Sequence, residues 1–322
     1  MSTIMSKKSA FIWGGLLLAL LFLCNGVWAL PGAKDWKSWA HSDGEMLQLL
    51  EKQHNEVIRS GQIIKDFSQG RLSQVAATQN LEKISAAASS HFSRFLRIEF
   101  PSDQNLKACA TDLMRSQLKQ IKAASGVLKR EKIERLDLLA LQSGEASVYR
   151  SQNRYFRARH NSVRLLVQNM KAAQQQEKEK KGLAKTAAPG ALLLNYYQYQ
   201  LNLISWQLEE LNCAENLTSA LNNLSQGNKA NSSAIVNQVK KLAKKCAQSP
   251  VPLGMEKLKE AYSQELDSFY RFAEAIALIE ADKSQDSLSR LYRCSANLQK
   301  RSREFEKINI TVWQDCFEDS KK

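Results

Sequence analysis

An arginine-rich stretch that contains no acidic residue is the strongest candidate binding site in this sequence. It runs from Tyr149 to Arg164 and mixes aromatic rings with basic side chains. In a helix, Arg150, Arg154 and Arg157 lie on one face, where guanidinium groups can form forked hydrogen bonds with phosphates or carboxylates. We therefore predict that an anionic partner binds at Arg150, Arg154, Tyr155, Arg157, Arg159 and Arg164. The alternative is a solvated basic face over an aromatic core.

The histidines give little support for a metal centre. The chain has four, and Glu51 with His54 has the Glu-x-x-His spacing of di-iron carboxylate bundles. Such a site needs a second copy on another helix, and neither His91 nor His160 has a glutamate at that offset. Signatures of common zinc, haem, hydrolase and nucleotide sites are also missing from the sequence. We therefore expect no metal and no cofactor, and we interpret Glu51 and His54 as a solvated pair.

The N-terminus has the pattern of a secretory signal peptide. Two lysines precede an uncharged apolar run from Ala10 to Leu23. A small residue at the expected cut site favours cleavage after Ala29, so we predict that residues 1–29 are removed and that the mature protein is periplasmic or secreted. The alternatives are an uncleaved inner-membrane anchor over residues 10–29 and lipidation at Cys24. Each of them places the rest of the chain outside the cytosol.

The cysteines predict one disulfide bond, because an exported protein meets oxidising conditions. Cys213 and Cys246 stand on either side of a turn signal at Gly227, which brings both near the same end of an antiparallel helix hairpin. The alternative is that every cysteine is a small buried apolar residue. The sequence leaves open the pairing of Cys109, Cys294 and Cys316.

The composition favours long helices and association with anionic partners. The 322 residues include only 13 glycines and 5 prolines, which argues against folds built on many tight turns. Lysine and arginine number 46 and aspartate and glutamate 32, a formal net charge of +14. A basic chain attracts anionic partners without specifying one. Outside the cytosol, we expect an anionic envelope component or an acidic protein as partner, and no nucleic acid.

Hydrophobic periodicity predicts helices along most of the chain. Ser42 with Glu45 has the pattern of a capping box at the start of the first long helix. Pro101 ends a later helix, and Asp103 is expected to cap the next. Beyond it, the sequence allows one long helix or two helices that break near Gly144. The fold class is therefore all-α, with long helices packed as one or two antiparallel bundles.

A polar segment rich in helix breakers divides the chain into two helical halves. Residues 174–190 contain a run of charged side chains followed by Gly182, Pro189 and Gly190. We predict an N-terminal half over residues 30–173, a linker over 174–190, and a C-terminal half over 191–322.

An almost wholly apolar run opens the C-terminal half, from Leu192 to Leu211. The run contains four aromatic residues, Tyr196, Tyr197, Tyr199 and Trp206. Their rings either belong to the core or line a ligand site between the halves. A cavity of several hundred cubic ångströms with convergent polar groups favours the ligand site, whereas a filled core favours surface binding.

These features lead to one functional expectation and two alternatives. We expect a non-enzymatic, exported helical protein of the cell envelope, which acts as a binding or structural module for a protein partner or an anionic surface. The first alternative is a ligand carrier or an enzyme with its site between the bundle halves. The second alternative is an assembly component of an envelope or secretion complex.

Overall fold

The computed structural model describes residues 36–68, 70–100, 103–129, 135–181, 190–225, 228–282 and 284–321. These residues form eight α-helices and no strand, which confirms the predicted all-α class. The helices are α2 (Trp36–Ser68), α3 (Gln74–Leu96), α4 (Gln104–Leu128), α5 (Arg135–Lys181), α6 (Ala191–Ser225), α7 (Ser232–Gln248), α8 (Glu256–Ala281) and α9 (Gln285–Asp319). The predicted signal peptide, residues 1–29, lies outside the described residues.

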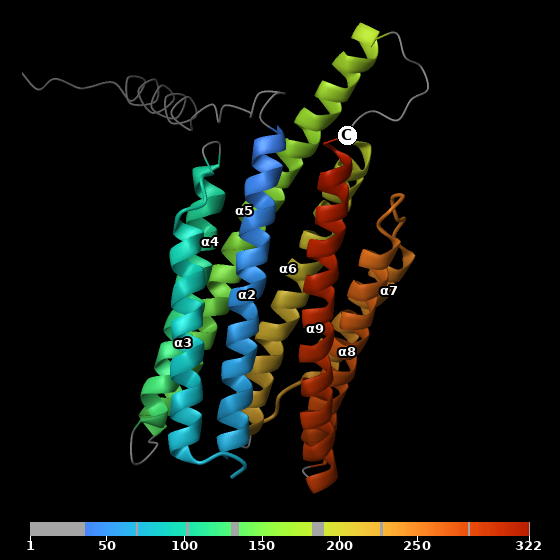
Figure 1. The fold of residues 1–322 in the computed structure, drawn as a ribbon. Coiled ribbons are helices and arrows are strands. Elements are labelled where there is room, and N and C mark those ends of the chain that lie inside the picture. The colour runs from blue at the N-terminus through green and yellow to red at the C-terminus, as the bar shows by residue number, and fades with distance from the viewer. Residues whose placement is uncertain are drawn as a thin grey trace, which may run out of the picture.

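Helices that follow one another in the sequence pack side by side, and the long helices run roughly along one direction (Figure 1). Side-chain contacts show that neighbours are antiparallel. Gln74 at the start of α3 donates a hydrogen bond to the carbonyl of Leu128 at the end of α4. Lys259 near the start of α8 donates to the carbonyl of Ala247 at the end of α7. Contacts between α2 and α9 bring the first and last described helices together.

The largest of four apolar clusters among the described residues joins the N-terminal half (α2 to α5) and the C-terminal half (α6 to α9). This cluster of buried residues draws on all eight helices, with members such as Trp39, Phe95, Leu106, Leu166, Tyr197, Leu242, Tyr262 and Phe305. Helix α5 continues through residues 174–181 of the predicted linker, and residues 182–189 lie outside the described part of the chain. None of the described helices has an apolar stretch long enough to cross a membrane.

The helix boundaries confirm one of the two predicted caps. Asp103 caps α4, where its side chain accepts a hydrogen bond from the backbone N–H of Leu106 at 3.0 Å. The predicted capping box at Ser42 is wrong, because α2 begins at Trp36 and Ser42 lies inside the helix. Its hydroxyl instead donates to the carbonyl of Glu99 at 2.8 Å. Helix α5 passes through Gly144 without a break.

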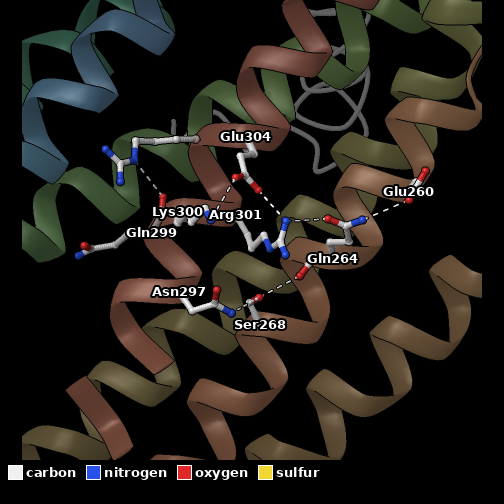
Figure 2. A network of polar contacts seen from close by, with 9 residues as sticks. Glu260, Gln264, Ser268, Asn297, Gln299, Lys300, Arg301 and Glu304 are labelled. Carbon is white, nitrogen blue, oxygen red and sulfur yellow. Dashed lines mark hydrogen bonds and ion pairs between the residues drawn. The ribbon is translucent and has the colours of Figure 1, made fainter. Parts of the chain in front are cut away.

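A network of polar side chains, which includes the buried Ser268, connects α9 to α8 (Figure 2). Arg301 donates from Nη1 to Gln264 Oε1 at 2.9 Å and to Glu304 Oε2 at 2.7 Å. Asn297 donates from Nδ2 to Ser268 Oγ at 3.0 Å. The exposed contacts among them contribute little stability individually. On the same helix, Ser302 and Glu306 line a cavity described below.

Candidate functional site

A buried ion pair joins α2 to α5, and a tyrosine of the C-terminal half contacts it. Arg159 on α5 donates from Nη2 to Asp43 Oδ2 on α2 at 3.0 Å, and their side chains are 3% and 0% exposed. Arg159 also donates to the hydroxyl of Tyr155 at 3.2 Å. From the C-terminal half, the Tyr197 hydroxyl donates to the same Asp43 oxygen at 3.3 Å and accepts from Trp313 Nε1 at 3.2 Å. Three helices, α2, α5 and α6, therefore meet at one carboxylate, and α9 joins them through Tyr197.

The guanidinium of this pair stays charged although it is buried. Burial opposes its charge, but the Asp43 carboxylate favours it, so the pKa of Arg159 lies above its ordinary value. A buried pair contributes little net stability, because desolvation offsets the attraction, but removing one partner is costly. We infer that Asp43 and Arg159 fix the register between α2 and α5.

Gly44 allows α9 to approach α2 beside this ion pair. A Cβ atom at this position would lie 2.0 Å from the ring of Trp313, which is buried. A glycine inside a helix costs about 1 kcal/mol relative to alanine. Here the absence of a side chain lets the indole reach Tyr197.

Two adjoining cavities lie between the halves, next to the ion pair. The first, of about 90 Å³, is lined from α2, α4, α5, α6 and α9, and its polar lining includes Glu51, His54, Gln117, Gln152, Arg159 and Glu306. The second, of about 210 Å³, adds Tyr149, Glu210, Glu265 and Ser302. The cavities adjoin because they share the lining residues His54, Gln152, Phe156, Gln207, Phe305 and Glu306.

The surroundings of the second cavity raise the pKa values of its three carboxyl groups. Burial raises the pKa of Glu210 to about 7, although the Tyr262 hydroxyl donates to it at 3.0 Å. Burial, together with the neighbouring Glu210, raises the pKa of Glu265 well above its ordinary value. Burial likewise raises the pKa of Glu306, helped by the charge of Glu51. Perturbed acids that gather in one cavity are typical of functional sites.

The basic side chains around the cavities do not neutralise these acids. Burial lowers the pKa of His54 to about 4, so at neutral pH its imidazole is uncharged, 4.0 Å from Glu306 Oε1. Arg159 is the only lysine or arginine among the described lining residues, and Asp43 already pairs with it. The cavity therefore contains more acids than the chain balances with its own cations.

Two buried acceptor atoms of the lining have no hydrogen-bond partner among the described residues. They are Oε1 of Gln117, whose residue is 4% exposed, and Oε2 of Glu306. A buried acceptor without a donor costs about 1–3 kcal/mol. The cost falls away when a molecule in the cavity supplies the donor.

The arginines predicted from the sequence divide into two groups. Four of them are exposed on α5 and form what we call the arginine stripe, Arg150, Arg154, Arg157 and Arg164. Arg154 lies 3.9 Å from Asp112, and Arg157 donates to Asn153 at 2.7 Å. The structure corrects the grouping for Arg159 and Tyr155, which are both 3% exposed and face the core. Two residues along a helix turn the chain by about 200°, which separates Arg159 from Arg157.

The predicted disulfide between Cys213 and Cys246 is not formed, and the five described cysteines are free thiols. The Sγ atom of Cys213 lies 3.9 Å from Gln238 Oε1 on α7, whereas the Sγ atom of Cys246 lies 3.7 Å from Ser263 Oγ on α8. Cys246 comes eight residues after Gln238, about 12 Å further along the helix. A disulfide needs Cα atoms about 4.4–6.8 Å apart, so the register of α6 and α7 keeps the sulfurs apart.

The rings of the apolar run form part of the core, so the alternative interpretation, that they line a site between the halves, is wrong. Tyr196, Tyr197, Tyr199 and Trp206 are at most 3% exposed and line neither cavity. Helix α6 turns other side chains toward the cavities instead, namely Gln200, Ile204, Gln207, Glu210, Leu211 and Ala214. The rings belong to the core, where Trp206 stacks on Tyr262.

Glu51 and His54 line the first cavity. The sequence had instead been interpreted as a solvated pair at the surface. In the described part of the chain, no group of three or more histidine, cysteine, aspartate or glutamate side chains is arranged to hold a metal ion. Sequence reasoning missed Glu210, Glu265 and Glu306. One signal was available for Glu265, because it lies on the apolar face of its helix that Tyr262 and Phe269 define.

Comparisons with models of known protein families, with curated protein sequences and with solved structures found no match for this chain. Its function must therefore be argued from its own residues. The adjoining cavities and the arginine stripe are the two features of the structure that suggest a function.

Proposed function

We propose that this chain is an exported, non-enzymatic helical protein that binds a small polar molecule in the adjoining cavities between its two halves. The observation that carries the proposal is the convergence of polar side chains from five helices on the first cavity. Ligand sites are concave, mostly preformed and often lie between packed helices. The proposal for export rests on the signal-like pattern of residues 1–29.

The cavity walls suit a molecule with both polar and apolar parts. Amide groups from Gln117, Gln152 and Gln207 can donate and accept hydrogen bonds. The rings of Phe156 and Phe305 line both cavities and offer apolar surface. The combination resembles ordinary ligand sites, in which a few polar groups orient a molecule held by apolar contacts.

A cavity-filling variant tests this proposal. Ala214 lines the second cavity, so the larger side chain in Ala214→Leu reduces the space for a ligand. Ala247 on α7 is exposed, and Ala247→Leu is the same change away from the cavities. We would screen amino acids, aliphatic amines, dicarboxylates and sugars by thermal shift. We expect one class to raise the unfolding temperature of the wild type and of Ala247→Leu, and not that of Ala214→Leu.

Two outcomes of this screen contradict the proposal. One is that no class stabilises the wild type. The other is that a class stabilises Ala214→Leu as much as the wild type, which places its binding site elsewhere.

The arginine stripe supports a second candidate function, the binding of an anionic envelope surface or an acidic protein partner. Its four side chains are exposed on one face of α5. The test is sedimentation with phosphatidylglycerol vesicles, with phosphatidylcholine vesicles as the control. Replacing all four arginines by glutamine should abolish the binding, and salt should weaken it in the wild type. Binding that survives the four replacements contradicts this candidate.

A further inference from the structure

The second cavity gathers acidic groups inside a strongly basic protein. The chain as a whole carries a formal charge of +14. Nevertheless, three carboxyl groups from three different helices line this cavity, Glu210 on α6, Glu265 on α8 and Glu306 on α9. Among the described lining residues of this cavity there is no lysine and no arginine.

We propose that the ligand of the cavities is a small aliphatic amine, whose ammonium groups supply the cation that the chain leaves out. This inference rests on the proposed binding function and names the class of ligand. An ammonium group carries three donors and no acceptor. Three buried polar atoms of the lining have no hydrogen-bond partner among the described residues. Two of them are acceptors, Gln117 Oε1 at the first cavity and Glu306 Oε2, whose residue both cavities share, and the third is the donor Nε of Arg159 at the first cavity.

The walls fit the rest of such a molecule. Tyr149, Phe156 and Phe305 line the second cavity, and aromatic faces attract ammonium groups. Leu211 and Ala214 provide apolar surface for a short methylene chain. A metal ion is a poorer fit, because the described residues contain no group of three or more histidine, cysteine, aspartate or glutamate side chains that could hold one.

Binding of an amine should release protons from the cavity. Burial raises the pKa values of Glu210, Glu265 and Glu306, whereas a nearby ammonium favours the charged carboxylate and therefore lowers them. The other titratable groups near them are Glu51 and His54 on α2, Tyr149 and Arg159 on α5, Cys213 on α6, Cys246 on α7 and Tyr262 on α8. Of these neighbours, only Arg159 is a fixed cation, and Asp43 neutralises it.

The experiment is a calorimetric titration of the purified full protein with three probes of equal chain length. The probes are 1,4-diaminobutane, the neutral 1,4-butanediol and the dicarboxylate succinate. We expect the diamine to bind at least tenfold more tightly than the other two. Repeating the titration in buffers with different ionisation enthalpies should show proton release on binding.

Isosteric variants test whether the acids carry the binding. Glu265→Gln and Glu306→Gln should each weaken diamine binding at least tenfold. Glu260→Gln on the exposed face of α8 is the matched control and should bind as the wild type does. Glutamine keeps the shape of a protonated glutamate, so the variants should fold, and circular dichroism and thermal unfolding check this.

The outcomes separate the two proposals. If the diamine does not bind but another class does, and Ala214→Leu blocks it, the amine inference is wrong and the binding function stands. If both glutamine variants bind the diamine as tightly as the wild type, the acids do not recognise it and the inference is also wrong. If no class binds at all, both proposals are wrong.

Discussion

Asp43 and Arg159 lie 116 residues apart and form an ion pair whose side chains are almost completely buried. The pair joins α2 to α5, and through Tyr197 the same carboxylate contacts α6. It lies next to the first cavity, because Arg159 also lines that cavity. The pair therefore helps to hold α2 and α5 in place, two of the helices whose side chains line the cavity.

Breaking this pair should destabilise the protein strongly. Asp43→Asn leaves a buried guanidinium without its counter-ion, and we expect a loss of about 3–5 kcal/mol in the free energy of unfolding. Asp112→Asn is the control, since this exposed partner of Arg154 should contribute less than about 1 kcal/mol. Urea denaturation measures both.

A double-mutant cycle shows whether the two side chains act as a unit. Arg159→Met alone leaves Asp43 buried and unpaired, whereas the combination with Asp43→Asn removes both charges. We expect the double variant to lose much less stability than the sum of the single losses. Additive losses would contradict a direct interaction.

A methyl group at Gly44 should destabilise the contact between α2 and α9. Gly44→Ala places a Cβ atom 2.0 Å from the ring of Trp313, and such overpacking costs about 1–3 kcal/mol. Gly61→Ala is the matched control in the same helix, where nothing lies within 4 Å of the new atom. That change should stabilise the protein by up to about 1 kcal/mol. Equal effects of the two substitutions on the unfolding temperature would show that α9 does not pack against Gly44.

Stability at low pH should depend on Glu280, which caps the start of α7 from the end of α8. Its carboxylate accepts three backbone hydrogen bonds, from Ala230 at 2.8 Å, Asn231 at 3.0 Å and Ser232 at 2.9 Å. These bonds lower the pKa of Glu280 to about 2. Because the folded pKa is below the unfolded value of 4.5, the contribution is complete above pH 4.5 and disappears as the pH falls toward 2.

The matching variant is Glu280→Gln. It should cost about 1 kcal/mol at neutral pH, where solvent screening limits the effect, and nothing once the pH is below the folded pKa. Thermal unfolding between neutral and acidic pH checks this, with Glu260→Gln as the exposed control. A loss that stays constant across the whole range would be inconsistent with a titrating carboxylate cap.

The thiols should differ in reactivity according to burial. Cys213, Cys246 and Cys316 are buried, and burial raises the pKa of Cys213 to about 11 and that of Cys316 to about 12. Cys109 and Cys294 are partly exposed. Iodoacetamide should therefore modify these two first in the native protein. Mass spectrometry after denaturation without reductant should show all five alkylated, and a pair that stays unmodified until reduction would indicate a disulfide.

The helices could be predicted from the sequence, but their lateral arrangement could not. Hydrophobic periodicity indicated most of the helices because each buries one continuous face. The capping box at Ser42 was misleading, because the helix begins earlier, at Trp36, and the Ser42 hydroxyl serves a tertiary contact. The separation of Arg159 from the arginine stripe follows from helical geometry alone and could have been predicted from the sequence.

The cavity could not be predicted because it depends on registers between distant helices. Nothing in the sequence around Glu210 or Glu306 marks either residue as part of a site. They line the same cavity only because α6 packs against α9. The same register decides that Cys213 contacts Gln238 rather than Cys246. Both results depend on how α6 packs against its neighbours. The hydrophobic periodicity of a single helix does not indicate that packing.

A crystal structure with the bound molecule from the thermal-shift screen tests the central claim most directly. The account predicts that the molecule lies between the halves, within hydrogen-bond distance of Glu265 and Glu306, and that α2, α5, α6 and α9 keep their positions. A molecule bound on the outer surface, with the space next to Phe305 filled by side chains of the protein itself, would contradict it.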